Sequence, residues 1–167
     1  MVSVAKQDRV DYGKDMAETE FTADTYHVAA LEHLQRAREL HERREYFLAH
    51  FLSGLAVECM LRAYRLLIDR KFDSRHDLRE LAKTARFYDL IPSERQIEFG
   101  ERVILLNERW RSNQRYMSEE QLKKYLSDLH ADFDKRGDRF KNNSKAVFEP
   151  AFEIVSLGDR KWNSKRR

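Results

Sequence analysis

The sequence predicts an all-α fold, an up-and-down bundle of four to five helices with a short extra element at the C-terminus. The chain of 167 residues contains only 2 Pro and 5 Gly, which is too few for the many turns of a multi-stranded sheet. Hydrophobic residues make up 41% of the chain and charged residues 37%, a balance that is typical of amphipathic helices with solvated outer faces. The length suits a single domain.

The first predicted helix follows a polar N-terminal arm at residues 1–22, which shows no helical periodicity. Thr22 or Asp24 can cap a helix over about 24–42. Within this range the apolar residues recur at helical spacing, at Tyr26, Ala30, Leu34, Ala37 and Leu40.

The second predicted helix, over about 45–70, carries two adjacent apolar stripes. Such a helix has neighbours on two sides, so we expect it at the centre of the bundle. Ser53, Gly54 and Ala56 are small enough to let another backbone approach closely. Gly54 lowers helix propensity by roughly 1 kcal/mol relative to Ala, and close packing is the compensating reason for its presence.

Two further helices are predicted over about 76–89 and about 93–112. Asp73 or Ser74 can cap the first of them. Pro92 stands at the start of the second, where its missing amide hydrogen leaves no extra unsatisfied acceptor.

The last predicted elements are a helix over about 119–139 and a short helix over about 150–157. Ser118 begins a capping box for the longer one. Pro150 is best tolerated at the start of a helix, and Gly158 favours its end, so the short helix is placed between them.

The chain is thus predicted to consist of a polar arm at 1–22, a helical bundle at 23–140, and an apolar segment with a basic tail at 141–167. Residues 135–167 hold 10 Lys or Arg against 4 Asp or Glu, while the net charge of the whole chain is +3. A basic tail that contains Trp162 can contact phosphates and stack on bases. The alternative is a solvated tail that aids solubility.

Several classes of site are disfavoured by the absence of their motifs. The single Cys59 excludes an intrachain disulfide and a Cys-based zinc site. No two-His-plus-carboxylate pattern, Gly-rich phosphate loop or nucleophile elbow occurs. We therefore expect no metal and no cofactor. No apolar run approaches the ~18–20 residues that span a bilayer, and no secretory signal is visible, so a reducing cytoplasm without membrane attachment is the simplest interpretation.

Two sets of polar residues could have either a chemical or a structural role. Glu58 and Arg62 are four residues apart and face the same way on the central helix. They could orient a catalytic group or bind a nucleotide, or they could form a partly buried ion pair. His76 could act as a base or bind phosphate at the start of the third helix, or Asp77 beside it could simply belong to a capping arrangement.

The strongest candidate contact site is the end of the fourth helix. Arginine binds phosphate bidentately, and Trp or Tyr can stack on a base; the site residues are Arg109, Trp110, Arg111, Asn113, Arg115 and Tyr116. In the alternative interpretation the two aromatic residues anchor the corner, and the arginines pair with Glu108, Glu119 and Glu120.

The order of these motifs resembles the HEPN superfamily over residues 26–135. The matching residues are Leu34 and Ala37, then Tyr46-x2-Ala49-x6-Ala56-x-Glu58-x2-Leu61-x-Ala63, then His76-Asp77-Leu78-x2-Leu81, and then Arg115-Tyr116. The resemblance implies an up-and-down bundle, usually a homodimer, that is associated with nucleotides or RNA. Many members are metal-independent endoribonucleases in toxin–antitoxin, defence or CRISPR systems, and others are non-catalytic partners.

The ribonuclease members of that superfamily use an Arg-x4–6-His motif late in the bundle, but no histidine lies between His76 and His130 here. Arg44 with His50 is the best remaining pair, and His76 follows Arg70 at the same kind of spacing. We therefore expect a non-catalytic or atypical module that binds RNA or nucleotide phosphates in a toxin–antitoxin, defence or mobile-element setting. The alternatives are a dimeric metal-independent endoribonuclease and a protein-interaction subunit, for example with a nucleotidyltransferase or a toxin.

Overall fold

The computed structural model describes residues 21–70, 76–129 and 138–164, and in these ranges the chain is helical without a strand. The α-helices are α1 (Ala23–Glu42), α2 (Tyr46–Ile68), α3 (Leu78–Thr84), α4 (Gln96–Arg109), α5 (Glu119–Asp128) and α6 (Arg139–Ser164). Short 3-10 helices stand between them: η1 (Phe87–Leu90), η2 (Ser93–Arg95) and η3 (Ser112–Tyr116). The prediction of an all-α bundle is confirmed.

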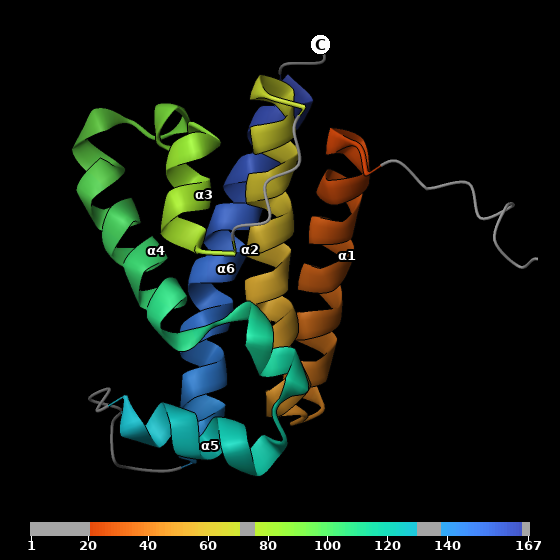
Figure 1. Cartoon of the computed structure of the whole chain (residues 1–167), viewed down its shortest axis with the longest axis vertical. Coiled ribbons are helices and arrows are strands. Elements are labelled where there is room, and N and C mark those ends of the chain that lie inside the picture. The colour runs from red at the N-terminus through yellow and green to blue at the C-terminus, as the bar shows by residue number, and fades with distance from the viewer. Residues whose placement is uncertain (1–20, 71–75, 130–137, 165–167) are drawn as a thin grey trace, which may run out of the picture.

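Helix α2 is the central helix, as predicted. It runs beside α1 and α6 along the long axis of the molecule, α3 and α4 lie on another side, and α5 crosses the base (Figure 1). The middle of this helix is buried, including Ala56, Val57, Met60, Leu61, Ala63 and Tyr64, whereas the apolar residues Leu48 near its start and Leu67 near its end are exposed. None of the helices in the described ranges is long and apolar enough to cross a membrane.

Gly54 has a packing role, but its neighbour is a side chain rather than the backbone that the sequence suggested. A Cβ atom built at Gly54 would lie 2.1 Å from Cγ of Trp110. The indole of Trp110 therefore lies directly against the α2 backbone. This contact fixes the chain segment that follows α4.

Helix α6 differs most from the prediction. The expected short helix at 150–157 is part of a continuous helix that runs through both Pro150 and Gly158. One face of α6 is buried in the bundle, at Val147, Ala151, Ile154, Val155 and Trp162. Burial of this face outweighs the local breaking signals, because most helical stability in proteins comes from tertiary packing. Gly158 serves the packing too, since a Cβ there would lie 2.5 Å from Sδ of Met60.

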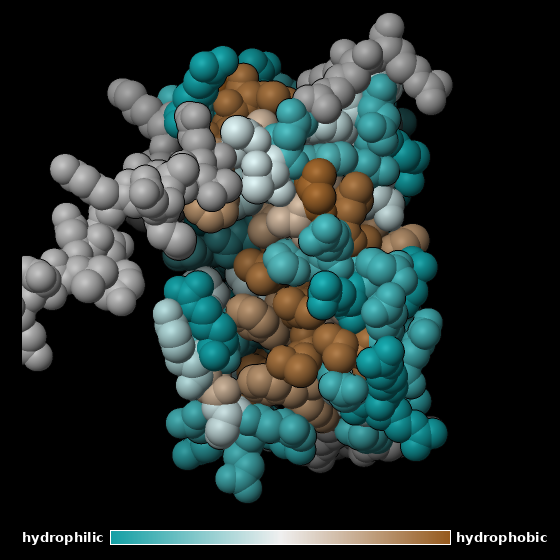
Figure 2. Space-filling view, turned by 90° about the vertical axis from the view of Figure 1, so that its right-hand side faces the viewer, coloured by the Kyte–Doolittle hydropathy of each residue, from teal (hydrophilic) through white to brown (hydrophobic). Residues whose placement is uncertain are grey.

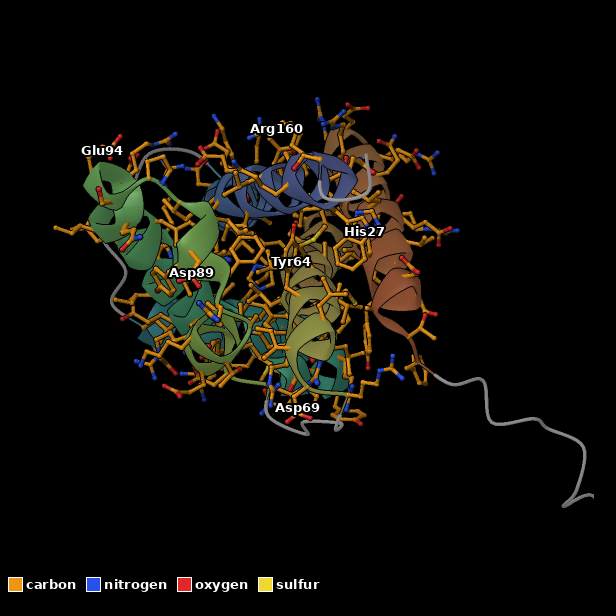
Figure 3. All side chains as sticks on the ribbon, turned by 90° about the horizontal axis from the view of Figure 1, so that it is seen from above. His27, Tyr64, Asp69, Asp89, Glu94 and Arg160 are labelled. Atoms are coloured by element: carbon orange, nitrogen blue, oxygen red, sulfur yellow. The ribbon has the colours of Figure 1, made fainter. Side chains whose placement is uncertain are left out.

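Trp162 belongs to the core and not to a free basic tail. Its ring stacks on His27 with a centroid distance of 4.6 Å, and His27 Nε2 lies 2.9 Å from Asp159 Oδ1. Tyr64 donates a hydrogen bond of 2.8 Å to the carbonyl of Gly158. Figure 3 shows His27 and Tyr64 turned into the space between α1, α2 and α6. In this position Trp162 cannot stack on a base.

The third predicted helix ends earlier than expected, and its cap is a different residue. Helix α3 stops at Thr84 because Arg86 adopts a left-handed conformation with a φ of 51°. The cap is Asp77, while the predicted caps Asp73 and Ser74 lie outside the described residues.

The other helix starts agree better with their signals. The side chain of Thr22 accepts from the amide of Thr25 at the start of α1. The capping box of Ser118 and Gln121 is present.

The predicted end of the fifth helix at about 139 is not observed: α5 ends at Asp128, and residues 130–137 lie outside the described ranges.

Candidate functional site

The corner between α4 and α5 is built on two buried side chains. Trp110 follows α4 in an extended conformation and is only 1% exposed. Its indole nitrogen donates a hydrogen bond of 2.9 Å to the carbonyl of Phe51 on α2. This burial contradicts the predicted role of Trp110 in stacking on a base and agrees with the alternative, in which Trp110 anchors the corner.

The second anchor is Gln114, which belongs to a buried network with His50. Gln114 donates a hydrogen bond of 2.8 Å to the carbonyl of Arg109, and its Oε1 lies 3.1 Å from His50 Nε2. Asn143 of α6 lies 3.2 Å from His50 Nδ1 and accepts from Arg109 at 3.4 Å. A neutral imidazole fits this network, accepting at Nδ1 and donating at Nε2. Burial lowers the pKa of His50 to about 4.

The pair of Arg44 and His50, a candidate for catalysis, is not brought together. His50 is fully buried and bonded at both ring nitrogens, so a substrate cannot reach it. Arg44 lies in an exposed turn with a φ of 66°. Sequence reasoning gave no role to Gln114 or Asn143, because each lies in a polar run where nothing in the local pattern marks it as buried.

Four residues of the predicted site remain at the surface of the corner, namely Arg111, Asn113, Arg115 and Tyr116. Tyr116 is 75% exposed, and the guanidinium of Arg115 lies 4.8 Å from the centroid of its ring. In the described part of the chain neither Arg111 nor Arg115 forms an ion pair. The predicted alternative, in which these arginines pair with neighbouring glutamates, is therefore not observed for them; Glu119 pairs instead with Lys123 at 2.6 Å.

Arg109 has a different environment from the two exposed arginines. It is half-buried, and burial lowers the pKa of its guanidinium. Its bond to Asn143 connects the end of α4 to α6. We therefore assign Arg109 to the support of the corner and not to its contact surface.

A second polar cluster joins α2 to the start of α3. Arg62 Nε donates to Glu58 Oε1 at 2.8 Å, and His76 Nδ1 lies 2.8 Å from the same oxygen. The side chains of Glu58 and Arg62 are 6% and 7% exposed, while that of His76 is 43% exposed. The ion pair that the sequence left as one interpretation is thus observed, with a histidine added from another element.

Asp77 caps α3 and connects it to α4. Its carboxylate accepts from the backbone of Arg79 and Glu80 and from Nδ2 of Asn107. Partial burial opposes ionisation, but the hydrogen bonds from Arg79, Glu80 and Asn107 lower the pKa of Asp77 to about 2. The role of Asp77 is the predicted structural one. Among the described residues, no group of three or more His, Cys, Asp or Glu side chains is placed to hold a metal ion.

Comparison with protein families decides the classification of this bundle. The family model for the HEPN domain matches residues 25–133. The chain belongs to the HEPN family. No curated protein and no solved structure matches the chain.

The HEPN assignment narrows the function to a nucleotide-related or ribonuclease-like module. HEPN domains often form dimers and bind RNA. The match covers the corner and the cluster of Glu58, Arg62 and His76, whereas α6 lies beyond it.

Proposed function

We propose that this HEPN domain binds single-stranded RNA or nucleotide phosphates at the corner between α4 and α5. The observation that carries the proposal is the exposed ring of Tyr116 beside two arginines that have no carboxylate partner in the described structure. Arginine recognises phosphate oxygens bidentately. An exposed aromatic ring offers a stacking surface that accepts any base.

The anchoring of the corner supports the same proposal. Trp110 and Gln114 hold the segment from inside through hydrogen bonds to Phe51 and Arg109. The exposed side chains are therefore carried on a backbone that is already in place, so less entropy is lost when they bind a ligand. Asn113, which is exposed between them, adds a polar group for bases or sugars.

The test is fluorescence anisotropy with a labelled single-stranded oligouridylate, measured at several salt concentrations. We expect Tyr116→Ala to weaken binding by about 1–3 kcal/mol, the value of one stacked base. Arg111→Ala and Arg115→Ala should each reduce the slope of log K against log salt by about 0.7. The matched control is Arg36→Ala, an exposed arginine on α1. Unchanged affinity in all three corner variants would show that RNA does not bind there.

A second candidate function is metal-independent RNA cleavage at His76. Glu58 accepts from Nδ1 of this histidine, and no described group is bonded to its Nε2. A buried carboxylate that orients an exposed imidazole is an arrangement suited to a general base, here for a 2′-hydroxyl. Arg62 lies beside the pair, with its Nη2 3.4 Å from His76 Nδ1.

Cleavage of a fluorogenic RNA in the presence of a metal chelator tests this second candidate. His76→Ala should abolish the activity, and Glu58→Gln should lower it and change its pH profile. His50→Gln serves as the control because His50 is buried away from solvent. If the wild-type protein leaves the RNA intact, or if His76→Ala cleaves it equally well, the domain is not a ribonuclease of this kind.

We also propose that the domain forms a homodimer through the face of the bundle on which α1 lies. Apolar side chains gather over the middle of this face (Figure 2). Val28 of α1 is 53% exposed. Val28→Lys should therefore lower the mass measured by light scattering, whereas Ile97→Lys on α4 should not.

Three expectations from the sequence stay predictions: a scaffold role, a nucleotidyltransferase or toxin as the partner protein, and a setting in defence.

A further inference from the structure

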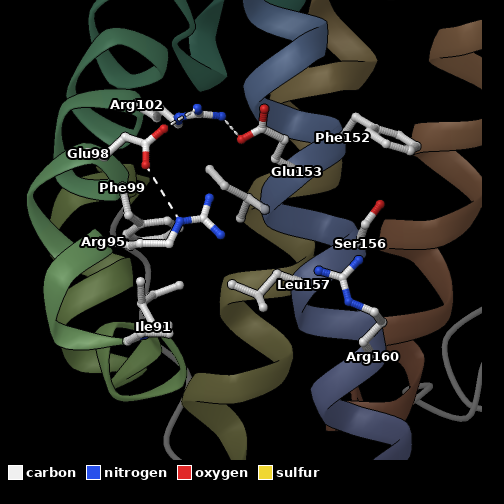
Figure 4. Close-up of a pocket in the computed structure, with 12 residues that line it drawn as sticks. Ile91, Arg95, Glu98, Phe99, Arg102, Phe152, Glu153, Ser156, Leu157 and Arg160 are labelled. Carbon is white, nitrogen blue, oxygen red and sulfur yellow. Dashed lines mark hydrogen bonds and ion pairs between the residues drawn. The ribbon is translucent and has the colours of Figure 1, made fainter.

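A separate cavity lies between α4 and α6, away from the corner and from the His76 cluster. It has a volume of about 240 Å³. The turn before α4 supplies one end of its lining, and α4 and α6 supply the two sides (Figure 4). Half of the residues that line this cavity belong to α6 and so lie outside residues 25–133, which match the HEPN family model.

The charges around the cavity are not balanced. Three arginines and two glutamates line it. Arg102 is bonded to both carboxylates, at 2.6 Å to Glu98 and also to Glu153. The lining therefore carries a net charge of +1, which Arg95 and Arg160 share because Arg102 is paired with both carboxylates.

These two remaining arginines are placed to receive an anion. The contact of Arg95 with Glu98 is long, at 3.6 Å. Arg160 forms no ion pair within the described residues. Figure 4 shows the guanidinium of Arg95 pointing from the α4 side towards α6, and that of Arg160 lying along α6 beside Ser156. Ser156 lies beside Arg160, and its side chain has no hydrogen-bond partner in the described structure.

The remaining lining residues are apolar, and several of them belong to the core. Phe99 and Ile91 are 7% and 8% exposed, and both belong to the core. Leu157 packs against the same core from α6. A ligand that fills the cavity therefore meets an apolar wall with a positive group at either side, a combination that suits a flat apolar body with one charged end.

We propose that this cavity binds a small organic monoanion with a flat apolar part. Arg160 and Arg95 hold the anionic oxygens, Ser156 donates a hydrogen bond to them, and Phe99 and Leu157 contact the apolar part. The volume is below the 300–1,000 Å³ of typical drug-sized sites, so the ligand is smaller than a drug molecule. Carboxylate and phosphate both fit the arginine pair.

The experiment is an NMR titration of the full chain with benzoate, phenyl phosphate, benzamide and acetate. Benzoate or phenyl phosphate should shift the side-chain signals of Arg95, Arg160 and Leu157. Whichever of these two ligands has the lower dissociation constant shows whether the cavity prefers a carboxylate or a phosphate. Benzamide lacks the charge and acetate lacks the ring, so both should bind at least about tenfold more weakly.

Two variants complete the test. Arg160→Ala should weaken the binding of benzoate or phenyl phosphate about tenfold or more, and Arg36→Ala, on an exposed face of α1, should leave it unchanged. Circular dichroism verifies that Arg160→Ala is folded, as expected for an exposed residue. The proposal is overturned if the anions leave the cavity signals unmoved, if benzamide or acetate binds as well as benzoate, or if Arg160→Ala binds like the wild type.

Discussion

Replacing Gly54 by alanine should destabilise the domain even though alanine is the better helix former. The new methyl group would overlap the ring of Trp110, whose Cγ lies 2.1 Å from the position of the added Cβ. Forcing an extra group into a packed core costs about 1–3 kcal/mol. Displacement of the indole breaks its hydrogen bond to Phe51, which adds about 1–3 kcal/mol, and the gain in helix propensity returns about 1 kcal/mol. We expect a net loss of about 3 kcal/mol.

Urea unfolding followed by circular dichroism measures this loss, and Gly100→Ala provides a matched control. Gly100 also lies within a helix, but a Cβ there would be 3.7 Å from the hydroxyl of Tyr88, an ordinary contact. That variant should gain up to about 1 kcal/mol. If Gly54→Ala is as stable as the wild type, Trp110 does not pack against α2 in this way, and our account of the corner fails with it.

Two further predictions concern the buried network and the last helix. The pKa of His50 is lowered to about 4 in the folded protein, so as the pH falls the unfolded chain binds a proton at this imidazole before the folded one does. The contribution of His50 to the free energy of unfolding should therefore be complete above pH ~6.5 and should fall by up to about 3 kcal/mol towards pH 4. The urea midpoint of His50→Gln should vary less over this range, and equal variation would contradict the assignment. Pro150→Ala should raise stability by about 1–3 kcal/mol, because proline lies inside a continuous helix; an unchanged thermal midpoint would instead favour the break predicted from sequence.

The agreement between prediction and structure depends on how local the signal is. The periodicity of α1 and α2, the cap at Thr22 and the capping box at Ser118 are set by neighbours within one or two helical turns, and all four are observed. The breaking signals at Pro150 and Gly158 were equally local, but they were outweighed because the buried face of α6 packs against α2, more than 80 residues earlier in the chain.

The candidate site shows the same division. The sequence located the arginines and aromatic residues of the corner, yet it could not sort them, because Trp110 and Tyr116 are both large aromatics in one short segment. Contact with Gly54 buries the first ring, whereas the second is 75% exposed. The meeting of His76 with Glu58 across 18 residues likewise depends on how α3 returns to α2.

The sequence by itself determined that this chain is an all-α bundle with a two-sided central helix and HEPN character, because hydrophobic periodicity and capping act over a few residues. Only the tertiary structure decided which polar groups are enclosed and which face solvent. It placed the imidazole of His50 inside a buried hydrogen-bonded network and left Tyr116 in solvent. It also brought Arg95 and Arg160, which are 65 residues apart in the chain, to the lining of one cavity. Such juxtapositions come from helices that pack together over long sequence separations, and no local pattern records them.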